Sequence, residues 1–209
     1  MKKQLKMLLV DFDGVMSNSR FYNSEIAAEK EMARSAVQTI FTAENSELLN
    51  DWMRGKVGYQ DIHNLVEQKT GVKAEDLDRL LEDSVKRMSI NRPMLAFIGK
   101  LRKKGVIVSL FTNNMDIFDS VSRRHYELDN HFDFIYSSSE YGQLKLENDT
   151  LLNRALHDAK TTKSEVAFVD DSQASYDAAT SFGVSTFLYK DYLDSQVVFE
   201  AWVEKRYQF

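Results

Sequence analysis

Short apolar runs that end in polar residues alternate along this chain with segments of helical spacing. The runs span residues 6–11, 106–112, 134–138, 166–170 and 185–189. Each run is nearly all apolar, as expected of strands that helices cover on both faces. Helices are predicted between them, near residues 93–104, 114–127, 147–159, 173–182 and 191–205. This alternation predicts an α/β fold built on a parallel sheet.

One long stretch, residues 16–91, interrupts the alternation and shows no convincing strand. Apolar residues recur there at helical spacing. They are Met32, Val37, Ile40 and Phe41, then Leu48, Leu49 and Trp52, then Leu77, Leu80, Leu81, Val85 and Met88. Gly55, Gly58 and Gly71 are predicted breaks between the helices. We therefore expect a core domain from residues 1–15 and 92–209, with a helical cap from residues 16–91 inserted after the first strand.

Composition excludes several classes of protein. Of the 209 residues, 43% are apolar and 28% are charged, which is typical of a globular domain. The net charge of −5 provides no basic field for nucleic acid or anionic lipid, and the absence of cysteine excludes disulfides and thiolate metal sites. The apolar run at residues 7–10 is too short for a signal peptide. We therefore expect a cytoplasmic protein with no nucleic-acid or membrane partner.

Carboxylates and other polar residues follow three of the predicted strands. Asp11 and Asp13 come directly after the first apolar run, and Asp170 and Asp171 follow the run at residues 166–170. Thr112 ends the run at residues 106–112 and Asn113 follows it, and Lys145 lies in the loop after the next strand. Since sites in open α/β sheets form at the carboxyl ends of strands, we expect these side chains to converge.

Four converging carboxylates require a compensating charge. Two like charges about 5 Å apart repel by roughly 3 kcal/mol at an effective dielectric of about 20. Either a hard divalent metal therefore lies among the acids, or some of them are protonated. The ligands are oxygens, and the four histidines are scattered without metal-ligand spacing, so Mg²⁺ is the expected ion. Mg²⁺ favours phosphate chemistry, in which Lys145 and Thr112 would contact the phosphoryl oxygens.

Four ordered motifs resemble those of the haloacid dehalogenase-like hydrolases. They are DFDGV at 11–15, FTNN at 111–114, Lys145, and FVDDSQASYDAA at 168–179. The segment WMRGKVGYQDIHNLVEQKTGVKAEDL at 52–77 is also similar to the helical cap of the sugar-phosphate phosphatase branch of that family. The resemblance implies a Rossmann-like core with an inserted α-helical cap, and hydrolysis of a small phosphorylated metabolite such as a sugar phosphate.

The resemblance also implies a role for each site residue. Asp11 would attack phosphorus to form an aspartyl phosphate, and Asp13 would protonate the leaving group and then activate water. The implied Mg²⁺ ligands are the Asp11 carboxylate, the Asp13 backbone carbonyl and Asp171. Asp170 would be either a further ligand or an acid that contacts the ligands and not the metal. Thr112, Asn113 and Lys145 would bind the phosphoryl group. Asn18, Ser19 and Arg20, just past the first motif, are candidate flap residues.

Other functions remain open at this point. A dehalogenase, a phosphomutase or a phosphonate hydrolase would share the scaffold, and a non-catalytic relative would use it as an interaction module. A phospho-receiver domain also combines acids, Thr and Lys, but it carries its acceptor Asp on a middle strand and has no helical insertion. One departure from the family pattern is Leu146, where proline usually follows the lysine. The sequence leaves the individual substrate and the oligomeric state open.

Overall fold

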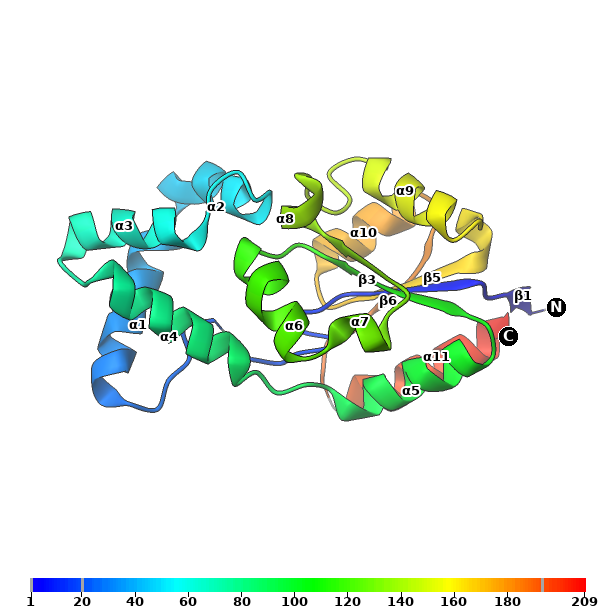
Figure 1. Ribbon diagram of the computed structural model, residues 1–209. Helices are drawn as coiled ribbons and strands as arrows, with labels where there is room; N and C mark the ends of the chain where they lie inside the picture. Colours follow the sequence, from blue (N-terminus) through cyan, green and yellow to red (C-terminus); the bar gives the residue numbers. More distant parts are fainter. Residues whose placement is uncertain (1, 20, 193) are drawn as a thin grey trace.

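A five-stranded parallel sheet forms the centre of the protein (Figure 1). The computed structural model describes residues 2–19, 21–192 and 194–209. Across the sheet the strands are β4 (Phe134–Ser137), β3 (Ile107–Thr112), β2 (Met7–Val10), β5 (Val166–Asp170) and β6 (Ser185–Leu188). All the pairings are parallel. The predicted α/β fold is therefore confirmed. Its central strand is β2, which is the first of the five along the chain.

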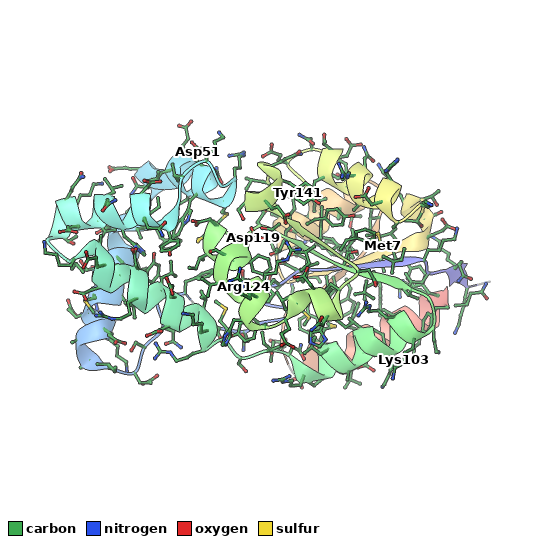
Figure 2. The ribbon with its side chains drawn as sticks, viewed as in Figure 1. Met7, Asp51, Lys103, Asp119, Arg124 and Tyr141 are labelled. Carbon is green, nitrogen blue, oxygen red and sulfur yellow. The ribbon has the colours of Figure 1, made fainter. Side chains whose placement is uncertain are left out.

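Helices cover both faces of this sheet, which explains the nearly continuous apolar character of its strands. Leu8 and Val10 of β2 share one apolar cluster with residues of α5 (Arg92–Lys103) and α11 (Asp194–Arg206). Met7 and Leu9 share the opposite cluster with residues of α9 (Thr150–Asp158) and α10 (Gln173–Ser181). In Figure 2, Met7 lies among the core side chains and Lys103 lies on the outside. None of the described helices is long and apolar enough to cross a bilayer.

The helices between β2 and α5 form a helical insert beyond the carboxyl ends of the strands (Figure 1). Its elements are α1 (Ala27–Ile40), a 3₁₀ turn (Ala43–Asn45), α2 (Ser46–Met53), α3 (Tyr59–Thr70) and α4 (Ala74–Lys86). Two predicted glycine breaks flank α3: Gly58 is the N-cap, and Gly71 ends the helix at φ +79°. The apolar residues of α4 form its buried face, as their spacing predicts.

The chain leaves the sheet domain and returns to it along two paired segments. Ser17 forms isolated bridges with Asp13 and with Ile90. Asn91 donates from its backbone N–H to the Met16 carbonyl at 2.8 Å and from its side chain to the Val15 carbonyl at 3.0 Å. The division into a core of residues 1–15 and 92–209 and a cap of residues 16–91 stays a prediction. The helical insert is thus attached through two short segments that lie side by side.

Two local features differ from the sequence prediction. The helix predicted over 114–127 is a π-helical turn (Phe118–Ser122) followed by α6 (Arg123–His125), and α7 (Leu128–His131) follows separately. The regular helix ends because Glu127 adopts a left-handed conformation at φ 50°. A second small sheet, of β1 (Lys3–Gln4) and β7 (Tyr207–Gln208), joins the two ends of the chain. Strands of two residues are too short to show a periodic pattern.

Candidate active site

The predicted polar residues meet at one edge of the sheet because β2 lies between β3 and β5. Val10 pairs with Leu110 on one side and with Val169 on the other. The residue that follows, Asp11, is therefore level with the last residue of β5 and with the last but one of β3. Asp170 ends β5, and Thr112 ends β3. The expected convergence at this edge is what the structure shows.

A buried ion-pair cluster occupies the centre of this edge. Lys145 Nζ lies 2.8 Å from Asp11 Oδ1 and 2.7 Å from Asp170 Oδ2. All three residues are buried. Burial raises the pKa of Asp11 to about 8, although Lys145 opposes the rise. Burial alone would lower the pKa of Lys145, but the attraction of the two carboxylates outweighs it and raises that pKa. Lys145 is therefore a fixed positive charge beside Asp11.

Asp13 has a different environment from Asp11. Its Oδ2 accepts a hydrogen bond of 2.8 Å from the side chain of Asn114, whereas its buried Oδ1 has no hydrogen-bond partner among the described residues. Burial raises the pKa of Asp13 to about 7, against the opposing effects of Lys145 and Asn114. A carboxyl group that titrates near neutrality and keeps one oxygen free can donate and accept a proton in turn.

The two predicted phosphoryl-binding residues on β3 and its loop occupy different positions. Thr112 is fully buried, and its hydroxyl has no hydrogen-bond partner in the described part of the chain. The Asn113 side-chain oxygen accepts a 2.6 Å hydrogen bond from the backbone N–H of Lys145. Asn113 therefore holds the loop that carries Lys145.

Asn114 was not among the predicted site residues, although it belongs to the FTNN motif. Its side chain holds Asp13, and its backbone N–H and carbonyl both bond the Ser138 hydroxyl, at 2.9 and 3.1 Å. Ser138 begins α8 (Ser138–Tyr141) at the end of β4. This double contact fixes the orientation of Asn114 and, through it, that of the Asp13 carboxyl. The polar TNN run was the only sequence signal for this role.

The acids at this edge fit a divalent cation. Oxygen atoms of Asp11, Asp170 and Asp171 lie within 4.8 Å of one another. Adjacent ligands of an octahedral Mg²⁺ are about 3 Å apart and opposite ligands about 4.2 Å apart, so the three carboxylates are near enough to share one ion. Gly14 allows the arrangement: it has φ +79°, and a Cβ there would lie 2.1 Å from Asp171 Oδ2. The donor set consists of hard oxygens, which suits Mg²⁺.

Leu146 gives the lysine loop a conformation that proline cannot adopt. Its φ is 63°, whereas the proline ring fixes φ near −65°. The Leu146 side chain is buried in the apolar cluster with Leu151, Leu152 and Phe168. Leucine in place of proline therefore goes with a left-handed turn, and burial of the Leu146 side chain stabilises that turn.

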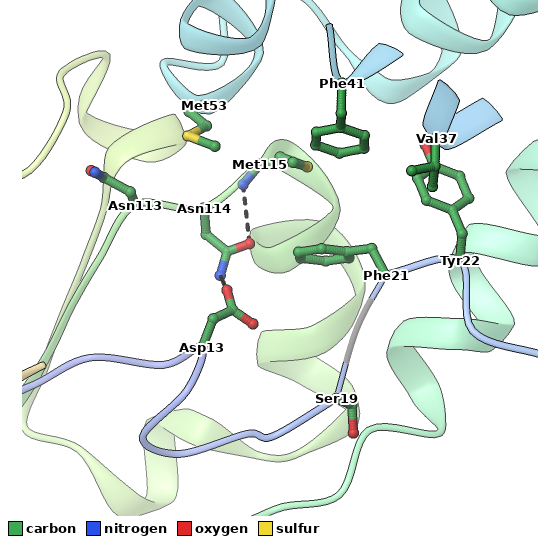
Figure 3. A pocket seen from close by; sticks show the side chains of 10 residues that line it. All are labelled: Asp13, Ser19, Phe21, Tyr22, Val37, Phe41, Met53, Asn113, Asn114 and Met115. Atoms are coloured by element: carbon green, nitrogen blue, oxygen red, sulfur yellow. Dashed lines mark hydrogen bonds between the residues drawn. The ribbon is translucent and has the colours of Figure 1, made fainter. Parts of the chain in front are cut away.

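A cavity of about 440 Å³ opens beside Asp13, between the sheet domain and the helical insert (Figure 3). Asp13, Asn113 and Asn114 line it from the strand ends. Ser19, one of the candidate flap residues, also lines it, and Arg20 lies outside the described residues. The cavity thus lies beside the Asp13 side chain.

Asp116 bonds the strand-end loop to the helical insert. Its Oδ1 accepts from the Trp52 indole N–H at 2.8 Å, and its Oδ2 accepts from the backbone N–H of Tyr59, the first residue of α3, at 3.1 Å. Asp116 lies only two residues after Asn114. The loop that holds Asp13 is therefore connected directly to the position of the insert.

We expect Asp116→Ala to lower the free energy of unfolding by about 1–3 kcal/mol, because it leaves two N–H donors without their acceptor. Urea unfolding followed by tryptophan fluorescence measures the change. The matched control is Arg54→Ala, which breaks the 2.6 Å ion pair of Arg54 with Glu147 across the same interface. That pair is partly exposed, so its loss should cost about 1 kcal/mol or less. Equal losses of unfolding free energy in the two variants would show that Asp116 stabilises the interface no more than the Arg54–Glu147 pair does.

A family model for haloacid dehalogenase-like hydrolases matches residues 8–189. The chain belongs to this family. The haloacid dehalogenase-like chain is 28% identical over 204 residues to bifunctional epoxide hydrolase 2 of Mus musculus. This match covers 88% of this chain and 36% of that protein. It is 32% identical over 123 residues to the GMP/IMP nucleotidase YrfG of Escherichia coli K12, covering 58% of this chain and 52% of that protein. It therefore spans only part of the length of either relative.

Solved structures of the haloacid dehalogenase-like family share this fold. A HAD family enzyme from Bacteroides thetaiotaomicron, solved with magnesium and inorganic phosphate, has a TM-score of 0.67 at 22% identity, over 88% of this chain and 93% of that one. The L-2-haloacid dehalogenase of Xanthobacter autotrophicus has a TM-score of 0.62 at 14% identity, over 88% and 76%. These likenesses concern the fold, and the match of the family model confirms the family predicted from the motifs.

Proposed function

We propose that this haloacid dehalogenase-like hydrolase is a Mg²⁺-dependent phosphatase that acts on a small phosphorylated metabolite through an aspartyl phosphate. The observation that carries the proposal is the contrast between its first two acids. Asp11 is ion-paired with Lys145, whereas Asp13 keeps a buried oxygen free and has a pKa raised to about 7 by burial. One acid suits a nucleophile beside a fixed positive charge, and the other suits proton transfer.

In the proposed first step, a carboxylate oxygen of Asp11 attacks phosphorus and the bond to the ester oxygen breaks. The departing alkoxide takes the proton of Asp13, so the alcohol leaves neutral. In the second step Asp13, now ionised, removes a proton from water. The water oxygen attacks phosphorus, which releases inorganic phosphate and regenerates Asp11. Lys145 and the free Thr112 hydroxyl would contact the phosphoryl oxygens and stabilise their charge in both steps.

The carboxylates of Asp11, Asp170 and Asp171, with the Asp13 backbone carbonyl, would hold Mg²⁺. The bound ion would supply positive charge beside the phosphoryl group. It would also favour the ionised form of Asp11, which burial disfavours. The Bacteroides thetaiotaomicron neighbour solved with magnesium and phosphate supports this part of the proposal.

A dehalogenase is the main competing function, because such an enzyme shares the fold. Halide leaves without a proton, so that reaction has no use for an acid two residues beyond the nucleophile. Asp13 lines the cavity, where a leaving group would need a proton. This placement favours phosphate-ester hydrolysis.

We expect a chelator to abolish phosphate release from phosphate monoesters and Mg²⁺ to restore it. In addition, Asp171→Asn should raise the Mg²⁺ concentration needed for half-maximal activity, because it removes one ligand. The metal-free variant should be at least as stable as wild type, since the change relieves carboxylate repulsion. Asp177→Asn, an exposed acid on α10, is the matched control and should change neither quantity. Full activity in metal-free buffer would contradict the proposal.

A further inference from the structure

Apolar side chains from four parts of the chain line the cavity beside Asp13 (Figure 3). They are Phe21 and Tyr22 before α1, Val37 and Phe41 on α1 and at its end, Met53 at the end of α2, and Met115 beside Asn114. Figure 3 shows the rings of Phe21 and Phe41 beyond the Asp13–Asn114 pair. No lysine, arginine or histidine is among the described lining residues. Away from Asp13, the described wall is therefore almost entirely apolar.

The polar atom of Tyr22 is already engaged. Its hydroxyl lies 2.8 Å from His63 Nε2, and His63 Nδ1 in turn bonds Asp78 Oδ1 at 2.5 Å. His63 is completely buried inside the helical insert, and Asp78, at the end of this chain of hydrogen bonds, is partly exposed. Because the hydroxyl is held by His63, Tyr22 contributes mainly ring surface to the cavity.

Val37 and Phe41 remain partly exposed at the cavity, with 39% and 42% of their surface accessible. The two residues are four positions apart, so they lie on the same side of α1 and its end. Their helical spacing predicts burial against the rest of the insert. Instead they present apolar surface to the space next to the site, where a bound group could cover it.

We infer that the cavity binds the alcohol portion of the substrate and that this portion is apolar, as in an alkyl or aryl phosphate monoester. The inference rests on the proposed phosphatase function. An apolar group would gain free energy by leaving water for this wall. The hydroxyls of a sugar would lose their water partners there and find few replacements among the described lining residues. The site should therefore prefer apolar esters to sugar phosphates.

The test is the series ethyl, butyl, hexyl and octyl phosphate, assayed by phosphate release with Mg²⁺. Their leaving groups differ little in acidity, so the chemical step is constant. We expect kcat/KM to rise by about two- to fourfold for each added CH₂ that becomes buried, until the cavity is filled. Glucose 6-phosphate should be a poorer substrate than hexyl phosphate.

Phe41→Gln tests the wall directly, and we expect it to lower the ratio of kcat/KM for hexyl to ethyl phosphate by about tenfold. Val197→Gln, the same kind of change at a residue that is 73% exposed on α11, should leave the ratio unchanged. Thermal melts would verify that both variants are folded. A ratio that Phe41→Gln leaves unchanged in folded protein would overturn the inference.

The outcomes separate this inference from the function on which it rests. Phosphate release that is independent of chain length, or greater from glucose 6-phosphate than from hexyl phosphate, would overturn the apolar preference and leave the phosphatase function intact. Failure to release phosphate from any ester in the presence of Mg²⁺ would overturn both.

Discussion

Asp11→Asn is expected to lower kcat for phosphate-ester hydrolysis by about 10⁴- to 10⁶-fold, because removing a nucleophile that acts together with neighbouring groups eliminates most of the catalysis. An amide cannot replace the carboxylate oxygen that attacks phosphorus. The fold should persist: Lys145 keeps its 2.7 Å contact with Asp170, and one buried carboxylate is removed. Steady-state phosphate release, with thermal melts of both proteins, measures the two effects.

The matched control for this variant is Asp76→Asn. Asp76 belongs to a second D-x-D pair in the chain, on α4 and not at a strand end. Its carboxylate is paired with Arg79 on the surface of the helix. Activity should therefore be unchanged in this control. If Asp11→Asn kept activity within tenfold of wild type, Asp11 would not be the nucleophile.

Asp13→Asn is expected to lower turnover of alkyl phosphates by about 10²- to 10⁴-fold, the usual contribution of general acid–base catalysis. Asparagine can still bond Asn114, but it has no proton of suitable acidity to give to the departing alkoxide. An aryl phosphate has a more acidic leaving group that departs without help. The loss should therefore be smaller for an aryl phosphate. Rates for an alkyl and an aryl ester, measured on wild type and variant, give the comparison.

The same two substrates also show the result that would contradict this role of Asp13. Equal losses on alkyl and aryl phosphates would mean that Asp13 does not protonate the leaving group. Mg²⁺ binding, measured by calorimetry, should persist in Asp13→Asn because the proposed contact there is the backbone carbonyl. Loss of Mg²⁺ binding would instead place the Asp13 carboxylate among the ligands.

The sheet and its polar edge could be predicted from the sequence because their signals are local. Asp11 and Asp170 each come at the end of a buried apolar run, and parallel strands bring such ends together. The residue types then limit the chemistry to that of hard oxygen ligands. The roles assigned to the individual site residues stay predictions that the variants above test.

Contacts between distant segments could not be predicted in this way. Asp116 meets Trp52 and Tyr59 across 64 and 57 residues of sequence, and no local pattern marks such a pair. Helical spacing likewise places Phe41 among the residues of a buried face, although it borders the cavity instead. The spacing of apolar residues predicts which face of a helix or strand is apolar, but it does not indicate whether protein or a ligand covers that face.

The measurement that tests the central claim most directly follows two products of the wild-type protein with Mg²⁺: phosphate from hexyl phosphate and chloride from 2-chloropropionate. We expect phosphate release that a chelator abolishes, and no chloride release. Chloride release from 2-chloropropionate, with no phosphate release from hexyl phosphate, would contradict the phosphatase function.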